Sequence, residues 1–167
     1  MQIKDKRAEE ERRRDTGPVY LSADGLVKLE KQLERLKQNL PDLIAETTRT
    51  AAYGDRSDNA EYKDAKGRLR GAQWRILTIQ DQLKRVVLIP TGPSATGAVQ
   101  MGSQVTVESN GEEKSFRILG SPEANPDKGC ISFQSPLGAA LIDHKVGDTV
   151  SVITKSGPRE YRIVKIN

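Results

Sequence analysis

Between positions 26 and 86, apolar residues recur at alternating steps of three and four, which is the spacing of a coiled-coil seam. They form two stripes, separated by the polar stretch "AAYGDRSDNAEY" at 51–62. Ser22 precedes the first stripe and is a plausible N-cap for a helix. The first stripe comprises Leu26, Leu29, Leu33, Leu36, Leu40 and Leu43 and continues to Thr47 and Thr50; the second comprises Tyr62, Ala65, Leu69, Ala72, Ile76, Ile79, Leu83 and Val86.

The two stripes mirror each other, as the helices of an antiparallel hairpin require. Every pair of positions, from Leu26 with Val86 to Thr50 with Tyr62, is centred on residue 56. That centre falls inside "GDRSD", so this acidic pentapeptide is predicted to be the tip of the hairpin. At about 1.5 Å per residue, a helix over 26–50 would place the tip roughly 35 to 40 Å from the base.

Three residues interrupt the helical pattern. Pro41 removes a backbone hydrogen bond at a cost of about 3 kcal/mol, which predicts a bend near residues 39–41. Gly67 and Gly71 each weaken a helix by about 1 kcal/mol relative to alanine, and we interpret them as sites of close packing.

The sequence after the hairpin has a different character. "PTGPSATGA" at 90–98 is typical of a linker, and segments with period-two alternation follow it. The prediction is therefore an α+β chain, with a helical hairpin and then a small antiparallel sheet domain that includes one short helix at 135–142. Strands are expected at 104–108, 115–119, 130–133, 149–154 and 161–166. The predicted parts are an arm at 1–19, the hairpin at 20–89 with its tip at 54–59, the linker, and the sheet domain at 99–167.

Composition supports this division. The hydrophobic share of the 167 residues is 35%, which is low for one large core and favours an elongated or two-part molecule. The arm carries six basic and five acidic residues and is predicted to be disordered or weakly helical. The sheet domain has eight of each, a balance that favours docking to protein over binding to nucleic acid.

Few residues are available for metal or redox chemistry. Cys130 and His144 are single, which excludes an internal disulfide, a zinc site built on paired cysteines and most histidine chemistry. A reducing, cytoplasmic setting is expected. No run approaches 18 apolar residues, so neither a membrane span nor a membrane partner is expected.

The tip holds the most distinctive candidate chemistry. Asp55 and Asp58 lie three residues apart, and paired carboxylates suit a hard cation such as magnesium. Two ligands are too few to hold the ion alone, so such a tip would act where a metal and phosphates already lie. The competing interpretation is a hydrophilic turn in which Asp58 or Asn59 caps the second helix.

Basic residues follow the tip on the second helix. Lys63, Lys66 and Arg70 share one side, whereas Arg68 and Arg75 lie on another. This row would guide a single-stranded nucleic acid by its phosphates. An ordinary solvated helix face is the alternative.

Taken together, these segments resemble the bacterial Gre factors, which are transcript-cleavage factors of RNA polymerase. "YGDRSDNAEY" is similar to the family's tip motif, and "GDRS" followed by "KGRLR" at 66–70 is closer to the GreB branch. "SFRILG" and "SPLGAALIDHKVGD" resemble signature segments of the sheet domain. The match extends from Leu21 onward.

The resemblance implies a finger that enters the secondary channel of RNA polymerase while an FKBP-like domain grips the channel rim. Asp55 and Asp58 would help to hold a Mg²⁺ ion of the polymerase active site and orient the attacking water. The polymerase would then cleave the 3′ end of backtracked nascent RNA, so the factor, a monomer with no cofactor of its own, is not itself the nuclease. The resemblance assigns tip contacts to Gly54, Arg56, Ser57 and Asn59, RNA contacts to Lys66, Arg68 and Arg70, and polymerase docking to Ser135, Pro136 and Leu137.

One departure from the family pattern leaves a second hypothesis open. Asp58 stands where the family usually has glutamate, which shortens the reach by about 1.3 to 1.5 Å. Because a misplacement of about 1 Å can cost on the order of a hundredfold in rate, the alternative is a channel-binding regulator that inhibits without cleavage. A third hypothesis is a prolyl-isomerase-like sheet domain, which its few aromatic residues, Phe116, Phe133 and Tyr161, disfavour.

Overall fold

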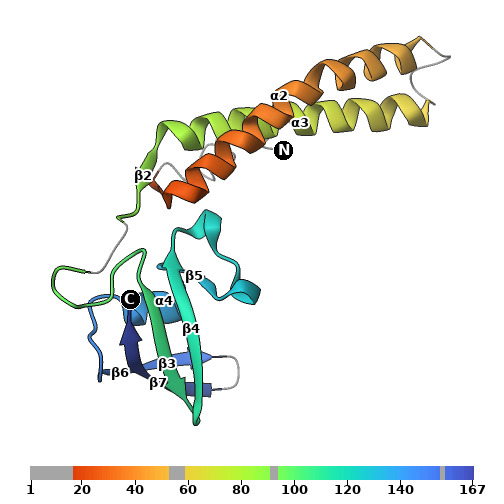
Figure 1. The fold of residues 1–167 in the computed structure, drawn as a ribbon. Helices are drawn as coiled ribbons and strands as arrows, with labels where there is room; N and C mark the ends of the chain where they lie inside the picture. Colours follow the sequence, from red (N-terminus) through yellow and green to blue (C-terminus); the bar gives the residue numbers. More distant parts are fainter. Residues whose placement is uncertain (1–16, 53–58, 91–93, 155–156) are drawn as a thin grey trace, which may run out of the picture.

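The computed structural model describes residues 17–52, 59–90, 94–154 and 157–167. Its two parts are a long helical hairpin and a small curled sheet domain at one end of that hairpin (Figure 1). The α+β architecture expected from the sequence is therefore confirmed. The arm predicted at 1–19 falls mostly outside the described residues.

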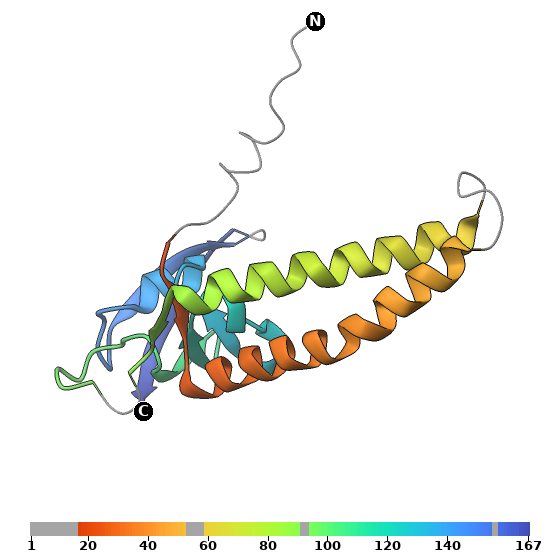
Figure 2. The ribbon, with the colours of Figure 1, turned by 90° about the horizontal axis from the view of Figure 1, so that it is seen from above.

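Helices α2 (Ala23–Ala51) and α3 (Ala60–Lys84) form the hairpin and lie side by side along it (Figure 2). As predicted, Ser22 is the N-cap of α2, where its Oγ accepts a hydrogen bond of 3.0 Å from the Gly25 amide. All predicted seam positions on both helices are buried or half-buried, which confirms the two stripes. The α2 leucines are only half-buried because each helix has a single neighbour along most of its length. The fully buried residues of the α3 stripe are Ala65, Ala72, Ile76 and Ile79.

The base of the hairpin differs from the prediction. Helix α3 ends at Lys84, so Val86 does not extend the helical stripe and belongs instead to strand β2 (Val86–Leu88). This strand pairs in parallel with β1 (Val19–Leu21). The pairing ties together the two ends of the hairpin, and it buries Val19 and Leu21 to 8% and 2% exposure.

The residues that interrupt the helical pattern leave both helices continuous. Helix α2 runs through Pro41 and curves through its middle part (Figure 2). Gly67 and Gly71 do not mark close packing, because a Cβ atom added at either would meet no atom within 4 Å. Both glycines face open space, so the packing interpretation was wrong.

The sheet domain is built from five strands in the order β5-β4-β3-β7-β6. All neighbours pair antiparallel except β4 and β5, which pair in parallel after a connection that contains two 3-10 turns, η1 (Ser121–Glu123) and η2 (Pro126–Lys128). All five predicted strands and the short helix are present. Their bounds are β3 (Gln104–Ser109), β4 (Glu112–Leu119), β5 (Cys130–Ser132), α4 (Pro136–Leu141), β6 (Thr149–Thr154) and β7 (Gly157–Ile166).

One core holds this domain together. Alternate residues of the strands, such as Val105 and Val107 on β3, point into it, and Leu141 of α4 packs there with 0% exposure. Val99, which directly follows the predicted linker, is also in this core at 1% exposure. In the part of the chain that the structure describes, no helix is long and apolar enough to cross a membrane.

Candidate functional site

The two helix ends that flank the predicted tip lie at the end of the hairpin opposite the sheet domain (Figure 1). Gly54, Asp55, Arg56, Ser57 and Asp58 fall outside the described residues, so their assigned roles stay predictions. The structure does describe the helix ends that carry them. Residue 52 caps α2 and residue 59 caps α3, and six residues, 53–58, connect the two.

Asn59 pins these two helix ends together. Its Oδ1 accepts a hydrogen bond of 3.0 Å from the amide of Tyr62, which makes it the N-cap of α3. Its Nδ2 donates a 2.9 Å hydrogen bond to the carbonyl oxygen of Thr50, in the last turn of α2. Of the two N-cap candidates, Asn59 is therefore the one that fills the position, and the connection at 53–58 starts and ends on fixed points.

Thr50 completes this junction from the α2 side. It is 2% exposed, and its Oγ1 donates a 2.9 Å hydrogen bond to the Glu46 carbonyl oxygen. Ala65 of α3, which is 1% exposed, lies on the matching part of the α3 stripe. Small side chains on the seam allow the helices to approach closely at this end.

The three predicted RNA contacts on α3 differ in what surrounds them. Lys66 and Arg70 are exposed, and the Lys66 ammonium lies 5.5 Å from the centre of the Tyr62 ring. A cation–π contact of this kind leaves the N–H donors of the ammonium available for a phosphate. Within the described ranges, no ion pair involves Lys66 or Arg70.

Arg68, in contrast, already has anionic partners. Its guanidinium lies 2.8 Å from a carboxylate oxygen of Glu46 on α2 and 3.0 Å from one of Asp64 on α3. The hydrogen bond to Glu46, and then the charge of that carboxylate, raise the pKa of Arg68 above its ordinary value. Arg68 therefore links the two helices, which sequence spacing did not indicate.

The predicted docking segment begins helix α4 in the sheet domain. The Ser135 hydroxyl caps this helix, because Oγ accepts from the Gly138 amide at 3.1 Å and donates to the Ser132 carbonyl oxygen at 2.6 Å. Leu137 is half-buried against the core, whereas Pro136 is exposed. Of the three residues, Pro136 is thus the one whose side chain is open to a partner.

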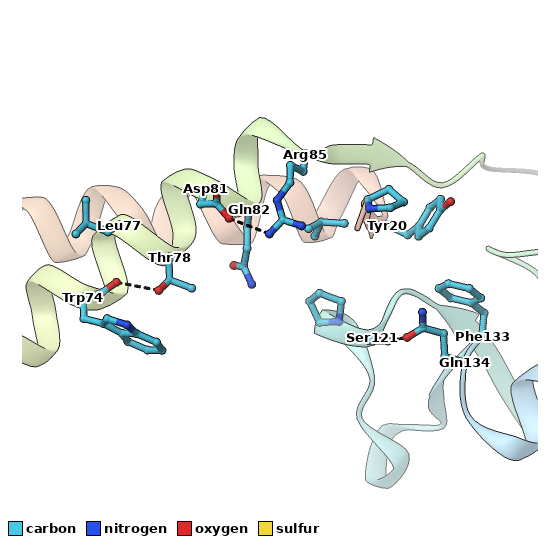
Figure 3. A pocket seen from close by; sticks show the side chains of 13 residues that line it. Tyr20, Trp74, Leu77, Thr78, Asp81, Gln82, Arg85, Ser121, Phe133 and Gln134 are labelled. Carbon is cyan, nitrogen blue, oxygen red and sulfur yellow. Dashed lines mark hydrogen bonds and ion pairs between the residues drawn. The ribbon is translucent and has the colours of Figure 1, made fainter. Parts of the chain in front are cut away.

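A hollow of about 590 Å³ lies beside this segment and was missed by the sequence analysis. Figure 3 shows it between the outer face of α3 and the sheet domain, with Trp74 and Leu77 on one side and Phe133 and Gln134 on the other. Trp74 and Leu77 are each 66% exposed. The signal available in the sequence was that both are large apolar residues off the seam of α3.

The described residues offer no metal site of their own. Among them, no group of three or more His, Cys, Asp or Glu side chains is placed to hold an ion. A magnesium ion bound through Asp55 and Asp58 would therefore need further ligands from another molecule or from water.

Two family models match the chain, and together they cover most of it. The model "Transcription elongation factor, N-terminal" matches residues 19–88, and "Transcription elongation factor, GreA/GreB, C-term" matches residues 94–167. The first match corresponds to the hairpin and its base strands, and the second to the sheet domain.

Individual proteins of this family are also similar to the chain over most of its length. The transcription elongation factors GreA of Chloroflexus aggregans and of Thermoanaerobacter pseudethanolicus are each 40% identical to this chain, over 89% of this chain and 97% of theirs. Among solved structures, the GreA factor homolog 1 (Gfh1) protein of Thermus thermophilus is 32% identical, over 90% of this chain and 99% of that one, with a TM-score of 0.42. Both family models and the curated relatives show that the chain belongs to the GreA/GreB family of transcription elongation factors.

Proposed function

We propose that this elongation factor binds RNA polymerase through its secondary channel and stimulates the polymerase's own cleavage of backtracked RNA 3′ ends. The observation that carries the proposal is the hairpin, whose helix ends at residues 52 and 59 lie far from the sheet domain and flank the segment that contains Asp55 and Asp58. The chain itself is then no nuclease, because its carboxylates act on a reaction that the polymerase performs.

The donor set of the tip fits a shared magnesium ion. Two aspartates supply hard oxygen ligands, and magnesium commonly takes one or two protein carboxylates together with phosphates and waters. Asp55 and Asp58 would hold the ion together with the polymerase and orient the attacking water. A bound magnesium ion would supply stabilisation of charge on the scissile phosphate.

The face of α3 next to the tip supports contact with the nascent RNA. Lys66 and Arg70 present cationic groups that lie outside the described ion pairs, and phosphates are attracted to such groups without regard to sequence. We assign the RNA contacts mainly to these two residues. Together with "GDRS" at 54–57, this basic face supports a tip closer to the GreB branch, although the relatives named above are GreA proteins.

The base of the molecule supports docking to a protein. Gln134, two residues before the exposed Pro136, lines the hollow together with Trp74 and Leu77. Large exposed apolar side chains such as Trp74 and Leu77 are typical of surfaces that partners cover. The sheet domain carries equal numbers of acidic and basic residues, so a uniform attraction to nucleic acid is not expected.

Stalled, backtracked transcription complexes test the proposal directly. RNA polymerase holding end-labelled RNA is incubated with magnesium, with and without the factor, and the RNA lengths are followed on a gel. We expect shortened RNA at a rate well above the intrinsic rate, followed by resumed elongation when nucleotides are added.

The alternative, a channel-binding inhibitor, is motivated by the short side chain of Asp58. It predicts that the factor slows nucleotide addition and leaves the RNA full length. Asp58→Glu helps to separate the two hypotheses, since a longer side chain would restore cleavage if reach alone were lacking. Binding with no cleavage by either protein would contradict the proposal.

A further inference from the structure

A carboxylate of the sheet domain is bound at the first turn of the hairpin. Both donors of Ser22 point to Glu123: the amide donates to Oε2 and the hydroxyl donates to Oε1, each at 2.6 Å. Ser22 is 7% exposed, and 101 residues separate it from Glu123 in the sequence. Short, charge-assisted hydrogen bonds of this kind are among the strongest in proteins.

The position of the carboxylate is electrostatically favourable. Ser22 is the N-cap of α2, where the partial positive charge of the helix is concentrated. The same Ser22 hydroxyl accepts from the Gly25 amide, so Glu123, Ser22 and the first turn of α2 form one continuous hydrogen-bonded unit. The sheet domain thus extends the cap of a helix that belongs to the other part of the molecule.

Two glycines make room for this contact. A Cβ atom at Gly25 would lie 2.3 Å from the carboxyl carbon of Glu123, and one at Gly120 would lie 1.8 Å from the carbonyl oxygen of Tyr20. Real Cβ atoms do not approach so closely. At position 120 the obstacle is the Tyr20 backbone, so the observed docking needs glycine there, whereas a Cβ atom at position 25 would force the Glu123 carboxylate to move away. The rings of Tyr20 and Phe133 meet edge to face nearby, with centroids 5.3 Å apart.

The contact adds a second attachment between the two parts of the chain. The covalent connection is the Pro- and Gly-rich segment at 90–98, and domains joined in this way move relative to each other unless an interface holds them. A small change in the orientation of the hairpin at its base produces a large displacement of its far end. At about 1.5 Å per residue, the 29-residue α2 is roughly 43 Å long, so a rotation of about 10° at the base moves the far end by roughly 7 Å.

We propose that Glu123 is a positioning residue whose carboxylate, held by Ser22 in the space left by Gly25, fixes the direction of the hairpin relative to the sheet domain. In the polymerase complex, this contact sets where the tip arrives; that consequence rests on the proposed function. The contact itself is a property of the free protein and is tested without the polymerase.

The orientation is measured by pulsed electron–electron resonance on the full chain. Nitroxide labels are attached to cysteines introduced at two exposed positions, Lys37→Cys on α2 and Ser151→Cys on β6, in a Cys130→Ser background. We expect one narrow distance distribution for the parent. Glu123→Ala should broaden or shift it, whereas Glu113→Ala, which removes an exposed carboxylate of the same domain, should leave it unchanged.

Gly25→Ala disturbs the contact between Ser22 and Glu123 without removing the charge of Glu123. This change keeps Glu123 and favours the helix, yet its Cβ would displace the carboxylate, so the distribution should broaden while the helical circular dichroism is kept. In the double variant with Glu123→Ala the clash is absent, so its distribution should match that of Glu123→Ala alone, a non-additive result. Distributions of Glu123→Ala and Gly25→Ala that equal the parent's would overturn the proposal.

A cleavage assay then links the contact to function. At saturating factor, Glu123→Gln should lower the rate of RNA cleavage by roughly tenfold or more, because small misplacements of reacting groups are costly. The Glu113→Gln control should cleave like the parent. If the label distances change as expected but the parent stimulates no cleavage, the positioning role stands and the proposed function fails. If cleavage is stimulated but the distances never change, Glu123 is not a positioning residue.

Discussion

At the scale of single residues, Asn59 explains how a short polar connection is held between two long helices. Its Oδ1 caps α3 by accepting from the Tyr62 amide, and its Nδ2 donates to the Thr50 carbonyl oxygen in the last turn of α2. Cap and crosslink are therefore combined in one side chain. Aspartate would keep the first role and lose the second, which makes the two contributions separable.

Asn59→Ala should lower the free energy of unfolding by about 1 to 3 kcal/mol, the sum of a lost N-cap and a lost hydrogen bond. Asn59→Asp should lose less, because its carboxylate still accepts from the Tyr62 amide. Urea denaturation followed by circular dichroism at 222 nm measures both. Equal losses for the two variants would show that the Thr50 contact, and not the cap, carries the effect.

The basic residues of α3 illustrate how neighbours decide the availability of a charge. Arg68 already binds carboxylates at 2.8 and 3.0 Å, whereas the contact that the described residues offer Lys66 is the face of the Tyr62 ring. Position on the helix alone would rank the three predicted RNA contacts equally. The structure ranks them by their neighbours, because Arg68 has carboxylate partners and Lys66 and Arg70 are in none of the described ion pairs.

Lys66→Ala and Arg70→Ala should each reduce crosslinking of the factor to a photoreactive RNA 3′ end in backtracked complexes by about tenfold, the effect of one charge-assisted hydrogen bond. Arg68→Ala should have a smaller effect. Lys37→Ala, which removes a positive charge from an exposed position on α2, is the matched control. A larger loss for Arg68→Ala than for the other two would refute this ranking.

At the scale of elements, the hairpin is stabilised mainly along one seam, and its outer faces are not optimised. Gly67 and Gly71 lie within α3 with open space around them. Glycine in a helix costs backbone entropy that alanine does not. Neither residue contributes packing in return.

Gly67→Ala and Gly71→Ala should therefore each raise the free energy of unfolding by about 0.5 to 1 kcal/mol, and the double variant by about the sum. Thermal unfolding followed by circular dichroism tests this. Gly25→Ala provides the contrast, because a Cβ there meets the Glu123 carboxylate. Destabilisation by Gly67→Ala or Gly71→Ala would mean that the glycine is needed for contacts beyond those described.

At this scale, the sequence predicts elements that show a local periodicity, but not pairings between segments far apart in the sequence. The leucine stripe from Leu26 onward and the alternation around Val105 are local periodicities, and both appear in the structure as expected. Strands β1 and β2 are three residues each, which is too short to show a period. They pair with each other although the whole hairpin separates them in the sequence, so no local pattern predicts the pairing. The sequence pattern therefore continues the second stripe through Val86, although the helix ends at Lys84.

At the scale of the whole molecule, the parts cooperate through contacts that join distant positions in the sequence. The hydrogen bonds of Ser22 with Glu123, and the ring contact of Tyr20 with Phe133, bring the hairpin base and the sheet domain together. The sequence predicts the two parts of the molecule, but not how they meet, because such contacts depend on tertiary packing. Asp55 and Asp58 lie outside the described residues, so their role is the central prediction.

The most direct test of that prediction is the rate of RNA cleavage in backtracked complexes at saturating Asp55→Ala factor. The tip proposal predicts a loss of about a hundredfold or more relative to the parent, with binding to polymerase unchanged, since a carboxylate that orients the reacting groups is removed. Glu30→Ala, an exposed carboxylate on α2, should cleave like the parent. Cleavage by Asp55→Ala at the parental rate would contradict the role of the tip.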